Sequence, residues 1–329
     1  MKVKKIFLFI LLFIFIFLVF YFFLGIFSIK NKNPNFFEIK KGEGFLEIGR
    51  RLEKEGFIKN RYSFYVYGFL TNQWKYLKPG KYKFENLSSR EIFKKIKEGR
   101  VELEKATIIE GLRLSEIDEI LMEKNIIKKP LSSFKIKDFK DQFLFLKDVD
   151  DDLSLEGFLF PDTYFFQFEM DEREVAMIFL KNFEEKISPL LEEIEKKNKT
   201  LFEIITMASM LEKEMTGKEN KKIAAGLLWK RLKHNMPLQV DATVNYALQK
   251  YKVRISLEDL KVDSPYNTYK YKGLPKGPIC NPSLESIQAA LFPEESDFWF
   301  YLTTKEGLVV FSKTYQEHLL NKKLYLDNQ

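Results

Sequence analysis

The feature that most constrains this chain is an apolar run at residues 6–27, which contains no charged side chain. A helix rises about 1.5 Å per residue, so this run would be about 30 Å long, the thickness of a bilayer's hydrocarbon core. A cleaved signal peptide has a shorter apolar region of about 7–15 residues, followed by small residues. Here the run ends in Phe27-Ser28-Ile29-Lys30, which lacks the A-x-A-like pattern of a cleavage site. We therefore expect one uncleaved transmembrane helix at 6–27.

The charges that flank this run give a slight preference for one orientation. Lys2, Lys4 and Lys5 precede it, and Lys30 and Lys32 follow it. Positive residues favour the cytoplasmic side, so residues 1–5 are expected to form a short cytoplasmic tail. No second apolar run of comparable length occurs in the sequence, which predicts a protein that crosses the membrane once.

The residue types available for chemistry are restricted. Cys280 is the single cysteine, so no intrachain disulfide can form, and the two histidines, His234 and His318, lie far apart. This excludes a zinc hydrolase of the H-E-x-x-H type and leaves few candidates for Ser-His-Asp catalysis. The net charge of +7 is spread over a long chain, unlike the basic patch of a nucleic-acid-binding protein. Carboxylates must carry any catalysis.

Residues 38–58 and 107–127 look like two copies of one unit. Glu38-Ile39-Lys40-Lys41-Gly42 aligns with Thr107-Ile108-Ile109-Glu110-Gly111 at a shift of 69 positions. Each copy predicts a strand, a glycine turn and an amphipathic helix, and a further strand at 79–84 and helix at 87–96 lie between them. Such units resemble LysM modules, which bind cell-wall glycans, but a pair of βα units used as a spacer has the same pattern. We expect a LysM-like α+β region at 36–129.

The second half of the chain is rich in predicted helices, which gives an α+β fold class overall. We expect an exposed connection at 130–153 and a loop at 263–283, a length that is usually functional. We expect strands at 298–303 and 308–312 to form a hairpin. The expected helices lie at 171–197, 200–215, 220–235, 238–249 and 284–292, with a terminal helix from Thr314.

The predicted helix over 201–215 carries two carboxylates in its last turn. On a helical wheel Glu212 falls inside the apolar face and Glu214 at its edge. Both groups lie at the negative end of the helix dipole and close to each other. These two effects should raise the pKa of a carboxyl group, as a general acid requires. The alternative is that Glu212 is a buried hydrogen-bonding residue and Glu214 a solvated charge. From the helix alone, this alternative is favoured.

Three further segments have a makeup suited to binding sugars, and each also has a plain structural interpretation. Glu156 and Asp162 lie among aromatic residues, as in a sugar cleft or at the end of a core strand. Gln239 and Asp241 precede a helix that Asp241 could simply cap. Residues 264–269 are dense in donors and aromatic rings, yet they could form only a proline turn.

Six segments follow one another in the second half of the chain: EGFLFPDTY (156–164), MASMLEKEM (207–215), RLKHNMPLQVDATVNYAL (231–248), SPYNTY (264–269), GLPKGPICNPSLESIQAALFP (273–293) and FSKTYQEH (311–318). In their order and residues these segments resemble the YceG-like family of endolytic murein transglycosylases, membrane-anchored cell-wall enzymes. The resemblance implies a helix-rich α+β catalytic domain at 150–329 on the outer side of the cell (inner or plasma) membrane.

The resemblance also implies a catalytic residue and a reaction. The family's catalytic glutamate is the second of its E-K-E triplet, which falls here on Glu214, so Glu212 receives a supporting role. Such enzymes cleave the β-1,4 link between N-acetylmuramic acid and N-acetylglucosamine within a strand and leave a 1,6-anhydro end. Glu214 would protonate the leaving oxygen and then accept the proton of the attacking C6 hydroxyl. The implied reaction needs no metal and no organic cofactor.

The expected substrate-binding residues line a glycan cleft around that glutamate: Glu156, Glu212, Gln239, Asp241, Tyr266 and Asn267. The implied partners are peptidoglycan glycan strands, the membrane, and wall synthases such as penicillin-binding proteins. We expect no nucleic-acid partner. Two alternatives stay open. One is a non-catalytic glycan-binding scaffold, and the other is a hydrolytic muramidase that uses water and a second carboxylate, Asp241 or Glu156.

Overall fold

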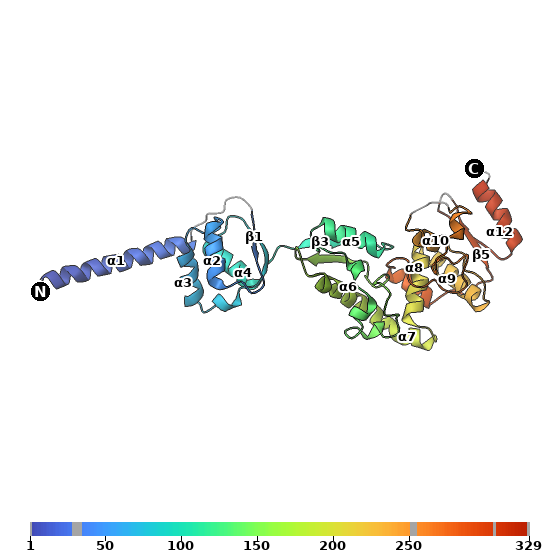
Figure 1. Ribbon diagram of the computed structural model, residues 1–329, viewed down its shortest axis with the longest axis horizontal. Helices are drawn as coiled ribbons and strands as arrows, with labels where there is room; N and C mark the ends of the chain where they lie inside the picture. The colour runs from blue at the N-terminus through green and yellow to red at the C-terminus, as the bar shows by residue number, and fades with distance from the viewer. Residues whose placement is uncertain (1, 28–34, 251–254, 305–306, 328–329) are drawn as a thin grey trace. The chain divides into compact units, whose positions relative to one another are not determined.

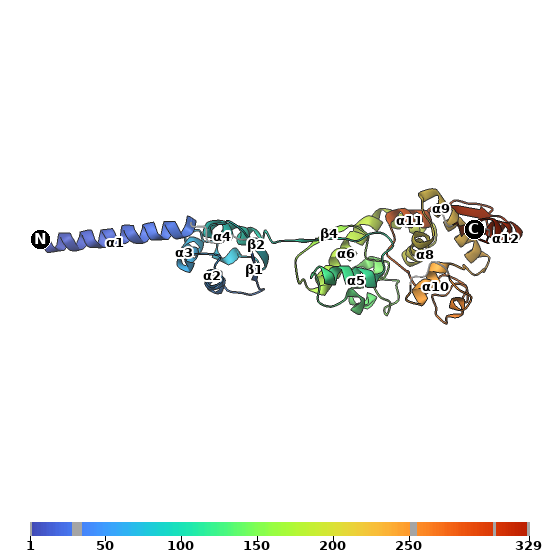
Figure 2. The same cartoon turned by 90° about the horizontal axis from the view of Figure 1, so that it is seen from above.

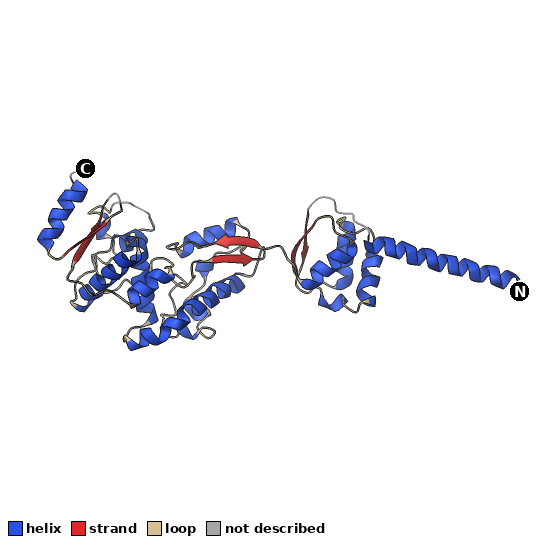
Figure 3. Cartoon of the chain, turned by 180° about the vertical axis from the view of Figure 1, so that it is seen from behind, coloured by secondary structure: helices blue, strands red, loops and turns tan. Residues whose placement is uncertain are grey.

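The computed structural model describes residues 2–27, 35–250, 255–304 and 307–327. The chain divides into two compact units: Met1–Glu104 with Phe165–Phe168, and Lys105–Tyr164 with Glu169–Gln329. Within the described ranges the strands form three two-stranded sheets, and helices make up most of the rest (Figure 3). The mixed, helix-rich α+β class is therefore as expected.

The first unit packs three short helices against a two-stranded sheet (Figure 1). The strands are antiparallel and place Phe37 opposite Tyr82. Both side chains are buried in an aromatic core that also contains Phe45, Phe64 and Phe93. The elements are α1 (Lys2–Phe27), β1 (Asn35–Ile39), α2 (Phe45–Lys54), α3 (Arg61–Leu70), β2 (Gly80–Phe84) and α4 (Ser89–Glu98).

Among the described residues, no helix is both long and apolar enough to cross a membrane. The transmembrane segment expected at 6–27 therefore stays a prediction.

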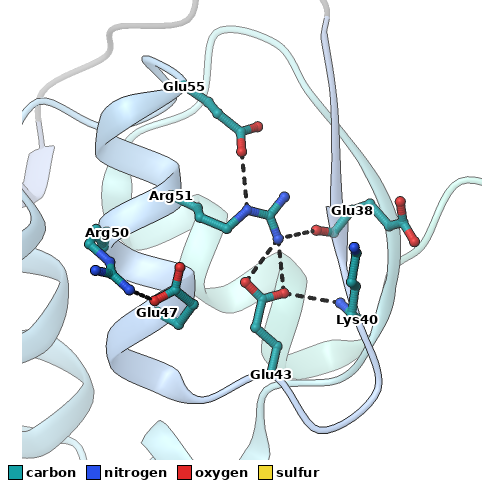
Figure 4. Close-up of polar contacts among 7 residues, drawn as sticks. All are labelled: Glu38, Lys40, Glu43, Glu47, Arg50, Arg51 and Glu55. Atoms are coloured by element: carbon teal, nitrogen blue, oxygen red, sulfur yellow. Dashed lines mark hydrogen bonds and ion pairs between the residues drawn. The ribbon is translucent and has the colours of Figure 1, made fainter.

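Polar contacts around Arg51 hold together the strand, turn and helix of the first predicted copy (Figure 4). The Nη1 group of Arg51 donates to the Glu43 carboxylate at 2.8 Å and to the Glu38 carbonyl at 3.1 Å. Its Nε donates to Glu55 at 3.2 Å. Glu43 also accepts the backbone N–H of Lys40 at 3.0 Å, which closes the turn. One arginine of α2 thus fixes the direction in which the helix leaves the strand.

The second predicted copy has the same order of elements but belongs to the second unit. It consists of β3 (Glu104–Thr107) and α5 (Leu114–Glu123), and β3 pairs with β4 (Thr163–Phe166). The single LysM-like region expected at 36–129 is therefore divided between the two units, and the second unit begins well before residue 150. A short local repeat specifies a strand and a helix, but it does not specify which strand β3 will pair with.

The exposed connection expected at 130–153 is wrong. This segment forms 3₁₀ turns at Leu131–Ser133, Ile136–Asp138 and Leu144–Leu146. Asp118 of α5 fixes the first turn by accepting the backbone N–H groups of Leu131 and Ser132. Apolar residues that recur every three to five positions fill the core here without forming a continuous helix. The buried ones are Leu131, Ile136, Phe139, Phe143, Leu146 and Val149.

The rest of the second unit surrounds the buried helix α8, which packs against α9, α10 and α11 (Figure 2). The helix expected at 171–197 is interrupted at Ser188–Leu190, while the predicted hairpin is confirmed as antiparallel. The expected tip of the hairpin includes residues 305–306, which lie outside the described residues.

The remaining elements of the second unit are α6 (Glu172–Ile187), α7 (Leu191–Lys196), α8 (Leu201–Glu214), α9 (Lys218–Lys233), α10 (Asp241–Ala247), α11 (Leu284–Leu291), β5 (Phe300–Thr303), β6 (Val309–Ser312) and α12 (Tyr315–Lys322).

Asn281 joins three distant segments of this unit and is completely buried. Its Oδ1 accepts the backbone N–H groups of Gly157 at 3.0 Å and Leu159 at 2.9 Å. Its Nδ2 donates to the Leu112 carbonyl at 3.0 Å and to Glu156 Oε1 at 3.1 Å. One side chain thus satisfies backbone groups that would otherwise be buried without partners.

Replacing Asn281 by alanine should lower the free energy of unfolding by about 2–5 kcal/mol, because two buried N–H groups lose their acceptor. Denaturant unfolding of the full chain measures this loss. The exposed amide of Gln142 provides the control, and Gln142→Ala should change stability by less than about 0.5 kcal/mol. Equal stability of the two variants would contradict the joining role of Asn281.

Candidate active site

The last turn of α8 places two carboxyl groups in different surroundings. Residues 204–211 of this helix are buried, and the helix ends at Glu214, where Met215 takes an extended conformation. Successive helical residues are about 100° apart, so Glu212 and Glu214 point about 200° apart around the axis. Glu212 and Glu214, only two positions apart in sequence, therefore contact different parts of the second unit.

Glu212 is fully engaged in structural hydrogen bonds at the start of α11. Its Oε2 accepts the Ser283 backbone N–H at 2.9 Å and the hydroxyls of Ser283 and Ser286. Lys221 lies 3.3 Å from its Oε1. Burial alone would raise the pKa of Glu212, but the serine hydrogen bonds and the lysine outweigh it and lower the pKa. The expectation of a raised pKa was wrong for Glu212, and it does not line the cavity described below.

Glu214 has the opposite electrostatic character. Its Oε1 accepts the Ala242 backbone N–H at 2.9 Å, and its Oε2 lies 3.4 Å from the hydroxyl of Tyr301. Burial raises the pKa of Glu214 to about 7, the charge of Asp241 adds to the increase, and the two hydrogen bonds oppose it. Near neutral pH the carboxyl group can therefore both give and take a proton, as general acid–base catalysis requires.

Glu214 lines a cavity of about 580 Å³ in the second unit. Gln239, Asp241, Tyr269 and Tyr301 lie in the same wall, and the Tyr269 hydroxyl donates to Asp241. A polar, aromatic-lined cavity of this size suits a saccharide segment. Among the residues that the structure describes, no group of three or more His, Cys, Asp or Glu side chains is placed to hold a metal ion.

Gln239 and Asp241 lie in the cavity wall, and the backbone around them is held by Thr268. Gln239 is exposed and has a φ of 55°, the left-handed conformation that residues other than glycine seldom adopt. Its N–H donates to the Thr268 carbonyl at 3.1 Å, and the Val240 N–H donates to the Thr268 hydroxyl at 3.0 Å. These bonds maintain a strained residue at the cavity, a pattern common at functional sites.

Asn267 must be removed from the expected cleft residues. It is completely buried, and its Nδ2 donates to the carbonyls of Leu260 and Val262, each at 2.8 Å. Its Oδ1 accepts the Tyr269 N–H at 3.0 Å. The amide group is therefore committed to shaping the loop, and it contributes to the site only by positioning Tyr269.

Glu156 and Tyr266 also lie outside the cavity wall. Glu156 is 5% exposed and accepts hydrogen bonds from the Leu114 N–H and the Tyr246 hydroxyl. Burial raises its pKa to about 8 against the effect of these bonds and of Arg113. Tyr266 packs against Tyr246 with ring centroids 4.7 Å apart. We expected both residues to contact glycan, but neither lines this cavity, and Glu156 is buried.

The wall residues that the sequence reasoning missed include Tyr301, Tyr269 and Arg113. Tyr269 belongs to the SPYNTY segment, so proximity to the expected residues was the available signal. Tyr301 lies in the predicted hairpin and Arg113 in the second predicted copy. Nothing in the sequence indicated that either segment reaches Glu214.

Comparison with known proteins identifies the family. The model of the YceG-like family matches residues 37–324, which is most of the chain. The chain belongs to the YceG-like family. A YceG-like protein of known crystal structure, from Listeria monocytogenes, has 32% sequence identity and a TM-score of 0.58. That comparison covers 89% of this chain and all of the Listeria chain.

Two curated relatives of this YceG-like chain are both named endolytic murein transglycosylase. The Bacillus subtilis (strain 168) protein is 35% identical over 237 residues, which is 68% of this chain and 65% of the relative. The Streptococcus pneumoniae (serotype 2, strain D39) protein is 30% identical over 320 residues, 85% of this chain and 56% of the relative. The chain thus spans somewhat less than two thirds of the length of these relatives.

The raised pKa of Glu214 predicts a pH-dependent cost in stability. A carboxyl group whose pKa rises from 4.5 unfolded to about 7 folded binds more protons in the folded state, so stability falls as pH rises between these values. Glu214→Gln removes this cost and should stabilise the chain by about 1–3 kcal/mol at pH 8 relative to its effect at pH 4.5. Chemical unfolding of parent and variant at both pH values measures the difference, and a pH-independent difference would contradict the shift.

Proposed function

We propose that this chain is an endolytic lytic transglycosylase of peptidoglycan, with Glu214 as its catalytic acid and base. The observation that carries the proposal is the raised pKa of a carboxyl group in the wall of a cavity wide enough for saccharide. The names of the two curated relatives support the same substrate class. The bond cleaved would be the β-1,4 link from N-acetylmuramic acid to N-acetylglucosamine. An endolytic enzyme cleaves this link within a strand and not only at its ends.

The hydrogen bonds of Glu214 favour one oxygen as the site of its proton. The Ala242 N–H can only donate, so Oε1 is held as an acceptor and the acidic proton belongs on Oε2. The hydroxyl of Tyr301 faces Oε2 and can act as acceptor or donor, so it accommodates both protonation states. We therefore assign to Oε2 the transfer of a proton to the leaving glycosidic oxygen.

The second half of the proposed reaction returns the proton. After the C1–O bond breaks, the ionised Glu214 accepts the proton of the C6 hydroxyl, whose oxygen bonds to C1. The products are a free 4-hydroxyl on one fragment and a 1,6-anhydro ring on the other, with no water consumed. One carboxyl group suffices for this sequence, unlike the pair used by most glycoside hydrolases.

A hydrolytic muramidase is the second candidate, and the position of Asp241 favours it. Asp241 is exposed and shares the cavity wall with Glu214, so it could activate a water molecule. Glu156, the other carboxylate considered for this role, is buried and does not line the cavity. A free reducing end among the products would indicate hydrolysis.

We also propose that residues 6–27 anchor the enzyme in the cell membrane, with residues 1–5 cytoplasmic and the cavity on the outer side. The uncharged apolar sequence of this segment supports the anchor. Peptidoglycan synthases such as penicillin-binding proteins are the proposed partners, because an anchored enzyme would meet strands where they are made. The region expected to be LysM-like, residues 36–129, is proposed to contact glycan.

Glu214→Gln should reduce the rate of release of 1,6-anhydro products from purified peptidoglycan by about 10²–10⁴-fold, because the proton donor is lost. Mass spectrometry of the soluble products measures the reaction. Glu219→Gln, on an exposed part of α9, is the matched control and should retain parental activity. Undiminished release by Glu214→Gln would disprove the assigned role, and reducing ends from the parent would disprove the anhydro reaction.

Tyr301→Phe should move the alkaline limb of the pH–rate profile to higher pH by about half to one unit, because the carboxylate of Glu214 loses a donor and its pKa rises. The activity depends on the protonated acid, so it falls as pH exceeds the pKa. The profile of kcat/KM on soluble glycan strands measures the limb. A variant with lower activity but an unmoved limb would show that Tyr301 acts only in packing.

A further inference from the structure

The wall of the cavity carries more cations than carboxylates. Among the described residues, the cations are Arg113, Lys213, Arg231 and Lys322, whereas the carboxylates are Glu214 and Asp241. Glu214 is partly protonated near neutral pH, so it offsets less than one charge. His318 in the same wall has a lowered pKa, because burial and the nearby cations disfavour its charged form. The cavity is therefore net positive without any contribution from histidine.

Three of these cations have no carboxylate at ion-pair distance within the described ranges: Arg113, Arg231 and Lys322. Arg231 is 5% exposed and is held by three carbonyl groups, those of Trp299, Pro237 and Leu238. A buried cation held only by neutral acceptors adds a fixed positive potential to the cavity.

Arg113 and Lys322 differ from Arg231 because their side chains are less buried. The Arg113 guanidinium lies 5.3 Å from the ring centroid of Tyr246, which orients it. The carboxyl group behind it is Glu156, whose pKa of about 8 keeps it mostly protonated at neutral pH. Glu156 therefore offsets the charge of Arg113 only in part, and the exposed Glu116 carboxylate accepts the backbone N–H of Arg113 at 2.7 Å. Lys322 comes from the end of α12, so the two cations reach the cavity from separate elements.

Aromatic rings lie in the same wall and provide a surface on which a sugar can stack. Phe300 and His318 stack with centroids 5.4 Å apart, and Tyr315 packs against Phe300 at 5.7 Å. Tyr315 is 56% exposed and leaves a ring face available. A ligand that matches this wall combines an apolar sugar face with negative charge.

We propose that the cavity recognises glycan through free carboxylate groups of the peptides attached to it, and that Arg113 and Lys322 bind these carboxylates. This inference rests on the proposed function. Where a peptide is attached, the lactyl carboxyl group of N-acetylmuramic acid is taken up in an amide bond, so the free carboxylates of such a strand belong to its peptides. A guanidinium and an ammonium group both form charge-assisted hydrogen bonds with carboxylates. Strands with charged peptides are then preferred over strands whose peptides are amidated.

The test compares peptidoglycan with the same material after its free carboxyl groups are converted to amides with ammonia and a carbodiimide. Amidation removes the charge and nearly preserves the size. Cleavage is measured with the full-length protein, and binding is measured by cosedimentation with a Glu214→Gln background that cannot cleave. The parent should prefer the charged substrate by about fivefold or more, the value of one or two favourable ion pairs.

Arg113→Gln and Lys322→Gln should each reduce this preference, and the double variant should bring the ratio close to one. Arg113→Lys keeps the charge and should retain much of the preference. Lys196→Gln, on the exposed surface of α7, is the control and should keep the parental ratio. Melting temperatures of all variants establish that they are folded.

Each outcome decides between the claims. A parent that does not distinguish the two substrates, or a double variant with the parental ratio, overturns the carboxylate site. If the parent cleaves neither substrate but binding shows the preference and the double variant loses it, the proposed reaction fails and the carboxylate site stands. If the parent cleaves both substrates at equal rates, the carboxylate site fails and the proposed cleavage of glycan stands.

Discussion

The chemistry of this protein depends on how the last turn of α8 separates two carboxyl groups. Glu212 receives donors from Ser283 and Ser286 and a lysine, so it stays ionised and anchors α11. Glu214 receives one backbone N–H and a long tyrosine contact, which do not offset its desolvation. The same helix therefore supplies a structural anion and a carboxyl group with a raised pKa two residues apart.

The cavity around Glu214 is assembled from segments that are far apart in the sequence. Ala242 at the start of α10 and Tyr301 in β5 contact its two oxygens. The buried amides of Asn281 and Asn267 hold the intervening loops through backbone groups. Neither asparagine contacts the cavity directly. Each one fixes a loop that carries wall residues or supports the wall, and the site depends on both in this way.

Much of the architecture could be predicted from the sequence. Periodicity gave most helices and the β5–β6 hairpin, and the family resemblance identified Glu214, Gln239 and Asp241, which share one cavity wall. The helix alone favoured a hydrogen-bonding role for Glu212, as the structure shows. The roles of Glu156 and Asn267 could not be predicted, because a polar residue within a motif can bind substrate or satisfy buried backbone groups. Tyr301 and Arg113 depend on tertiary contacts that no local pattern records.

The central claim is that Glu214 holds its proton near neutral pH. Carbon-13 NMR of the full-length protein, labelled at the glutamate carboxyl carbons and titrated from pH 4 to pH 9, measures this directly. The Glu214 resonance is assigned by its absence from Glu214→Gln. We predict that it titrates with a pKa of about 7, as burial requires. A titration near 4.5, the ordinary value for glutamate, would contradict the claim.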